Sequence, residues 1–231
     1  MDFLLAGEGP SDLGSVDDNG VLKKGAMAFV IDAFCEQNSL PAPQYLGLLR
    51  HARLSKLAAK PSRGGPERPA KKNGAAFYDQ AAALAKKAKD DACGAVYFQD
   101  SDREDWNGLY KAVTLGFKSQ DMGERCVAML PNPKSEAWLL AYFQNNESSQ
   151  QAYNHAERFE EMSGNDSSPK SLKKKLAELL DCEVNEIYNH ITEEVIHDIE
   201  WNRVDMPSFN QFKTDFRAVV QKLSHSPTPA V

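Results

Sequence analysis

A chain of 231 residues, 42% hydrophobic and 26% charged, has the composition of a soluble globular protein and excludes collagen-like, disulfide-scaffold and mostly disordered classes. No apolar run approaches the roughly 18 residues that a membrane-spanning helix needs, and the net charge of −6 disfavours a surface that binds nucleic acid everywhere. Because Asp2 follows Met1 without a basic segment, and the four cysteines are widely spaced, we expect a cytoplasmic protein with reduced thiols.

The first 143 residues alternate between short apolar runs and helical patterns. Strands are predicted over 3–6, 44–49, 94–99 and 125–130, where apolar residues are bounded by Gly, Pro or acidic residues. Helices are predicted over 24–37, 75–89, 106–117 and 135–143. Between the first strand and helix, Ser11-Asp12 offers a helix cap, and residues 14–20 are typical of a loop. This alternation predicts an α/β fold, with a mostly parallel sheet flanked by helices.

A basic segment follows the second predicted strand. Residues 50–72 hold eight Lys and Arg against one acid, Glu67, so the segment carries +7 and the rest of the chain −13. Its Pro and Gly residues argue against regular structure. Such a segment is typical of a solvated loop or of a nucleic-acid contact. For the second interpretation the candidate residues are Arg50, Arg53, Arg63, Arg68, Lys71 and Lys72.

Carboxylates follow two of the predicted strands. Glu8 stands between two glycines after the first strand, and Asp100 and Asp102 follow the third, with Glu104 two residues further on. The carboxyl ends of parallel strands meet at one edge of the sheet, where ligands bind in open α/β folds. Two hard oxygen ligands at this spacing suit Mg²⁺, although a lone Asp-x-Asp is also common on protein surfaces. The sequence therefore predicts an acidic site at this edge.

Three segments carry a family resemblance. Residues 4–12 (LLAGEGPSD) resemble the first motif of TOPRIM domains, and residues 97–104 (YFQDSDRE) resemble the second. Residues 133–141 (PKSEAWLLA) are similar to a segment of small stand-alone TOPRIM-like proteins. Those proteins resemble the nuclease part of OLD-family enzymes and are often encoded beside an ATPase in phage-defence gene clusters. The resemblance covers about residues 1–143, although the gap between the two acidic motifs is long for a TOPRIM core.

The resemblance implies a metal-dependent nuclease. Glu8, Asp100 and Asp102 would bind Mg²⁺ or Mn²⁺, and Glu8 would also act as general base or acid. Glu104 or Glu136 would complete a second metal position, and Lys134 would neutralise a phosphate. A helix-start acid and a solvated lysine are the plainer interpretations of Glu136 and Lys134.

The implied partners are a nucleic acid, DNA or RNA, and an ATPase protein, in an antiviral defence complex without a membrane. The alternative is a non-catalytic TOPRIM-fold subunit that binds nucleic acid or regulates a complex. A small-molecule phosphohydrolase on a generic parallel sheet is a third interpretation, and fold alone does not decide among them.

The amino-acid composition of the chain changes past residue 145. A polar stretch precedes helical patterns over 172–180, 183–199 and 209–223, and no strand is predicted there. His190 and His197 in the second of these patterns are too far apart to bind one metal alone, and Lys173 to Lys175 are typical of a solvated helix. We therefore expect an α/β domain over 1–145 with a basic insertion at about 50–74, a helical extension over 146–223 and a flexible tail over 224–231.

Overall fold

The computed structural model describes residues 1–18, 21–58, 68–69, 74–102, 104–143, 158–164, 167–168 and 171–225. Four parallel strands form the central sheet in the order β4-β1-β5-β6. They are β1 (Asp2–Gly7), β4 (Gln44–Arg50), β5 (Gly94–Phe98) and β6 (Cys126–Met129). These are the four predicted strands, and the predicted α/β fold with a parallel sheet flanked by helices is confirmed.

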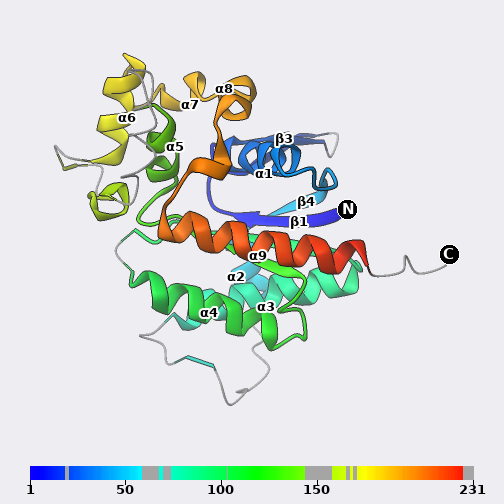
Figure 1. The fold of residues 1–231 in the computed structure, drawn as a ribbon. Helices are drawn as coiled ribbons and strands as arrows, with labels where there is room; N and C mark the ends of the chain where they lie inside the picture. The colour runs from blue at the N-terminus through cyan, green and yellow to red at the C-terminus, as the bar shows by residue number, and fades with distance from the viewer. Residues whose placement is uncertain are drawn as a thin grey trace.

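Helices cover both faces of this sheet. Side chains alternate along each strand, so Phe3 and Leu5 face one core and Leu4 and Ala6 face the other. The first core is covered by α1 (Ala26–Gln37), α5 (Ser135–Phe143) and the last helix, α9 (Pro207–Ser224). The second is covered by α2 (His51–Ala58), α3 (Ala75–Asp90) and α4 (Trp106–Lys118). Figure 1 shows α9, in orange to red, lying across the sheet.

The order of the strands places a switch in chain direction at the carboxyl ends of β1 and β5. The chain leaves β1 toward α1 on the first face, whereas it leaves the neighbouring strand β5 toward α4 on the second face. In open α/β sheets the ligand site lies where adjacent strands send the chain to opposite sides. Both acidic motifs of the sequence follow these two strands.

Two elements differ from the sequence prediction. The predicted loop at 14–20 contains part of a hairpin, β2 (Gly14–Val16) paired with β3 (Leu22–Lys24). Gly14 has φ +102°, and a Cβ there would stand 1.9 Å from the Lys23 carbonyl oxygen, so only glycine allows the close approach. The prediction that the basic segment lacks regular structure is wrong for its first part, because α2 buries Leu54 and lies before the Pro and Gly residues.

The carboxyl-terminal part is helical, as predicted. It contains α6 (Leu172–Leu180), α7 (Ile187–His190), α8 (Glu193–Asp198), a 3₁₀ turn (Trp201–Arg203) and α9. The single helix predicted over 183–199 is two short helices, because Thr192 caps α8 by accepting a hydrogen bond from the Val195 N–H. Most of the predicted tail, residues 226–231, lies outside the described residues. No helix in the described ranges is long and apolar enough to cross a membrane.

The helical part shares its core with the sheet. Phe216 of α9 stacks on Phe3 of β1 at 5.7 Å between ring centroids and meets the edge of Phe34 of α1 at 6.1 Å. Trp138 of α5 packs against Phe209 at 4.8 Å. The described helices after residue 143 therefore share the first core with the sheet.

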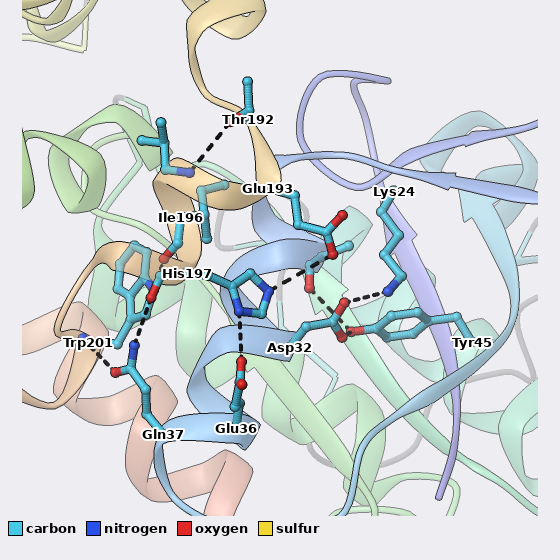
Figure 2. A network of polar contacts seen from close by, with 12 residues as sticks. Lys24, Asp32, Glu36, Gln37, Tyr45, Thr192, Glu193, Ile196, His197 and Trp201 are labelled. Atoms are coloured by element: carbon cyan, nitrogen blue, oxygen red, sulfur yellow. Dashed lines mark hydrogen bonds and ion pairs between the residues drawn. The ribbon is translucent and has the colours of Figure 1, made fainter.

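Polar contacts also bind α8 and the 3₁₀ turn to α1 (Figure 2). The His197 ring contacts the Glu36 carboxylate at 2.8 Å, and Glu193 lies 4.0 Å from its other nitrogen. Gln37 donates to the Ile199 carbonyl and accepts from the Trp201 N–H. Both ring nitrogens of His197 thus face carboxylates of the α1–α8 junction.

Replacing Phe216 with Ala tests this shared core. Phe→Ala in a packed core costs about 3–5 kcal/mol, and Phe216 is fully buried. We expect the free energy of unfolding, measured by urea denaturation, to fall by that amount in one cooperative transition. Leu179→Ala on the outer side of α6, where Leu179 is 38% exposed, is the control and should change it by less than about 1 kcal/mol. An unchanged first transition in the Phe216 variant, with α9 melting separately, would contradict a core shared by α9 and the sheet.

Candidate functional site

The loop after β5 is bonded to the loop after β6. Beyond the paired strands, the N–H groups of Gln99, Ser101 and Asp102 donate to the carbonyls of Met129, Pro131 and Pro133 at 3.2, 3.1 and 2.8 Å. Asp102 adopts φ +48°, a left-handed conformation that Asp tolerates better than most residues. This ladder holds Asp100 and Asp102 beside the first turn of α5.

Asp100 accepts a hydrogen bond from the first turn of α5. The Ser135 N–H donates to its carboxylate at 2.9 Å. The residue is partly buried, and burial raises the pKa of Asp100 well above its usual range. The negative charges of Glu136 and Asp12 raise that pKa further, and the Ser135 hydrogen bond opposes them. The aspartate predicted from the Asp-x-Asp motif therefore belongs to a group of neighbouring acids.

Glu136 is the most buried of these acids, with 1% of its surface exposed. The Tyr188 hydroxyl of α7 donates to its Oε1 at 3.0 Å, and Lys173 Nζ of α6 lies 3.9 Å from the same oxygen. Its other oxygen, Oε2, is buried without a hydrogen-bond partner among the described residues. The helical part therefore supplies a cation and a hydroxyl to the site. The interpretation of Lys173 as a solvated lysine did not predict its contact with Glu136.

Asp12 belongs to the same group, although the sequence indicated only a helix cap there. The Ser135 hydroxyl donates to its carboxylate at 3.4 Å. Burial first, and then the charge of Glu136, raise the pKa of Asp12 to about 6, and Lys173 opposes this shift. Glu8 also contributes to raising it, so the two acids of the first motif lie within electrostatic range of each other. In the sequence, the only indication that Asp12 belongs to the site was its place in residues 4–12, which resemble the first TOPRIM motif.

Glu8 lies at the open side of the site. Its side chain is 65% exposed, and His51 Nδ1 lies 3.3 Å from Oε1. The guanidinium of Arg50 donates to the carbonyls of Glu8 and Gly14 at 2.8 and 2.7 Å. Arg50, a candidate contact for nucleic acid, therefore fixes the loop that carries Glu8.

Asp102, Lys134 and Glu104 differ in their surroundings. Lys134 Nζ lies 3.4 Å from Asp102 Oδ1; the lysine side chain is 14% exposed and that of the aspartate 53%. Lys134 is thus enclosed beside the predicted acids rather than solvated. Glu104 is exposed on the turn that leads to α4, and its N–H bonds to the Ser101 carbonyl. Nothing places its side chain among the buried acids.

The remaining predicted basic contacts divide into three groups. Arg53 is exposed on α2. Arg68 pairs through two nitrogens with the Asp79 carboxylate of α3, with a distance of 2.8 Å from Nε. Arg63, Lys71 and Lys72 lie outside the described residues.

The chemistry of the donors fits a hard divalent cation. Glu8, Asp12, Asp100, Asp102 and Glu136 offer only carboxylate oxygens, the ligands that Mg²⁺ and Mn²⁺ prefer. Glu136 Oε2 is a buried acceptor that nothing described satisfies, and burial first and then neighbouring negative charge raise the pKa values of Asp12 and Asp100. Within the described residues, no three His, Cys, Asp or Glu side chains already stand as a metal-binding group, so binding a cation requires some side chains to move.

Comparisons of the chain with protein-family models, curated proteins and solved structures find no match.

The raised pKa of Asp12 predicts how stability varies with pH in metal-free buffer. The folded chain keeps the proton up to about pH 6, whereas the unfolded chain releases it near the ordinary aspartate pKa of 3.8. Asp12 therefore lowers stability as the pH rises from 4 to 6. Asp12→Asn removes this cost, so at pH 8 in EDTA the variant should be more stable than the parent by about 1–2 kcal/mol, less than the full shift implies because solvent screens a partly exposed group.

The difference between the two proteins should be nearly absent at about pH 3, below both pKa values, where Asp12 is mostly protonated in the folded and the unfolded chain. Urea denaturation at the two pH values measures it, with Asp18→Asn on an exposed turn as the control. A stability difference that is equal at both pH values would show that the pKa of Asp12 is not raised in the folded chain.

Proposed function

We propose that this protein hydrolyses phosphodiester bonds in nucleic acid with Mg²⁺ or Mn²⁺. The observation that carries the proposal is the group of enclosed carboxylates beyond the carboxyl ends of the sheet strands, with Glu136 Oε2 buried and without a described partner. Burying like charges is costly unless protons or cations neutralise them. A cation bound by these acids would also bring a phosphate to the edge of the sheet, and the TOPRIM resemblance of the same residues supports this interpretation.

The proposed role of each side chain follows from how exposed it is. Asp100, Asp12 and Glu136, which are enclosed, would hold the cation, and Tyr188 would keep Glu136 in place. When bound, the metal supplies charge neutralisation and activation of a water molecule. Glu8, which is exposed, would add one further oxygen ligand to the cation and would accept a proton from the attacking water. Lys134 and Lys173 would bind the nonbridging phosphate oxygens, because both amines already lie at the acidic group.

The basic segment supports a polyanionic substrate. Helix α2 begins at His51, directly beside Glu8, and carries Arg53 and Lys56 on its exposed face. Cations would therefore follow the chain outward from the acids, where they could bind phosphates flanking the one that is cleaved. The same resemblance leads us to propose an ATPase protein as partner and a role in antiviral defence.

One observation favours a second candidate, a non-catalytic nucleic-acid-binding or regulatory subunit. Within the described ranges the acids are not arranged as a ready-made metal site. A chain that kept the fold and its basic segment but did not bind the cation would bind nucleic acid without cutting it.

Cleavage assays on plasmid DNA, single-stranded DNA and RNA decide between the two candidates. We expect cleavage with Mg²⁺ or Mn²⁺, none in EDTA, and a loss of about 100-fold or more in Asp100→Asn and Glu8→Gln, because cation binding and proton transfer are removed. Asp90→Asn, on the exposed end of α3, is the matched control and should cleave like the parent. Cleavage in EDTA, or a parent chain that neither cleaves nor binds Mn²⁺ by calorimetry, would contradict the proposal.

The salt dependence of binding tests the basic segment. Arg63, Lys71 and Lys72 replaced together by Ala should reduce the slope of log affinity against log salt on duplex DNA by up to about 2.7, since each phosphate contact contributes about 0.9. The control replaces Lys86, Lys89 and Lys118, exposed near the carboxyl ends of α3 and α4 and thus toward the opposite edge of the sheet. Equal slopes for the parent and the first triple variant, measured by fluorescence anisotropy, would make the segment a contact for a protein instead.

A further inference from the structure

We propose that His51 is a positioning residue that orients Glu8 and thereby sets the metal affinity of the acidic site. The inference rests on the proposed function and extends it to a residue that no sequence motif indicated. Its basis is a contact between the first residues beyond two neighbouring strands.

The register of the sheet places the two residues side by side. Strands β1 and β4 are parallel neighbours, and Gly7 is paired with Arg50. The next residue along each strand is therefore Glu8 on one and His51 on the other. Their side chains meet at 3.3 Å between His51 Nδ1 and Glu8 Oε1. Arg50 also holds the Glu8 carbonyl, so both the backbone and the side chain of Glu8 are tied to the end of β4.

The His51 ring is itself fixed by packing against an aromatic side chain. It is 7% exposed and stacks on Tyr97 of β5, with centroids 5.0 Å apart and planes inclined by 12°. The Tyr97 hydroxyl donates to Gln80 of α3 at 2.6 Å, and Gln80 donates to Ser55 of α2 at 2.9 Å. A rigid ring therefore meets a carboxylate that is otherwise mostly exposed.

The contact fixes which nitrogen carries the proton. An ionised carboxylate can only accept a hydrogen bond, so Nδ1 must donate to Glu8. Burial lowers the pKa of His51 by more than the bond to Glu8 and the nearby Phe98 carbonyl raise it, which favours an uncharged ring. Nε2 is buried and has no hydrogen-bond partner among the described residues.

This arrangement leaves the second oxygen of Glu8 for the cation. His51 occupies Oε1, so it restricts the rotation of an exposed side chain without neutralising its charge. Partners that orient a metal-binding carboxylate in this way typically change metal affinity by 10- to 100-fold.

Calorimetric titration with Mn²⁺ alone tests the role of His51. We expect His51→Ala to weaken Mn²⁺ binding by about 10-fold. His51→Asn, whose amide can donate from near the Nδ1 position, should restore most of the affinity, whereas His51→Gln, whose amide lies nearer the Nε2 position, should not. His225→Ala, at the exposed end of α9, is the control. Equal Mn²⁺ affinity in the parent and His51→Ala, or equal recovery by Asn and Gln, overturns the inference.

Nitrogen-15 spectra of the histidine rings, recorded without metal at pH 8, test the contact separately. We expect the proton of the parent ring to lie on Nδ1 and this preference to be lost in Glu8→Ala. A proton on Nε2 in the parent, or a spectrum unchanged in Glu8→Ala, overturns the inference even if Mn²⁺ binds. A parent that binds no Mn²⁺ overturns the proposed function, whereas a parent whose affinity is insensitive to His51 overturns only the inference.

Discussion

The constraint on which this structure depends is a group of acidic side chains that lie close together with little access to solvent. Glu136 is fully buried, and Asp12 and Asp100 are enclosed enough that their pKa values rise. Lys173 and the Tyr188 hydroxyl offset only part of this charge, and one oxygen of Glu136 has no described partner. Such a group costs stability in the metal-free chain and gains most from a divalent cation. Sites that lower stability in this way are commonly functional.

The scaffold explains how the acids are kept together. Asp12 follows β1, Asp100 follows β5 and Glu136 begins α5 after β6, so three neighbouring strands deliver them to one edge. Ser135 binds both aspartates, through its N–H and its hydroxyl. The carboxyl-terminal helices then cover Glu136 from the first face of the sheet and are fixed there by the aromatic core around Phe216 and Trp138. These helices are therefore part of the site rather than an appendage.

Sequence patterns predicted the features that depend on local periodicity. The four strands and the main helices follow from apolar spacing, and the positions of Glu8, Asp100 and Asp102 follow from the strand ends. Patterns failed where distant residues decide the outcome. Lys173 and Tyr188 reach Glu136 from 37 and 52 residues away, and Arg50 is bound by loop carbonyls rather than left for phosphates. Asp12 was missed because its pattern also suits a helix cap, and the hairpin because its strands have only three residues each.

Anomalous diffraction from crystals soaked in Mn²⁺ at pH 8 tests the central claim most directly. The account predicts a Mn²⁺ peak beyond the carboxyl ends of β1 and β5, in contact with carboxylate oxygens of at least two of Asp12, Asp100 and Glu136, and its loss in Asp100→Asn. Mn²⁺ bound only elsewhere on the surface, with the three acids unchanged and unoccupied at saturating metal, would contradict it.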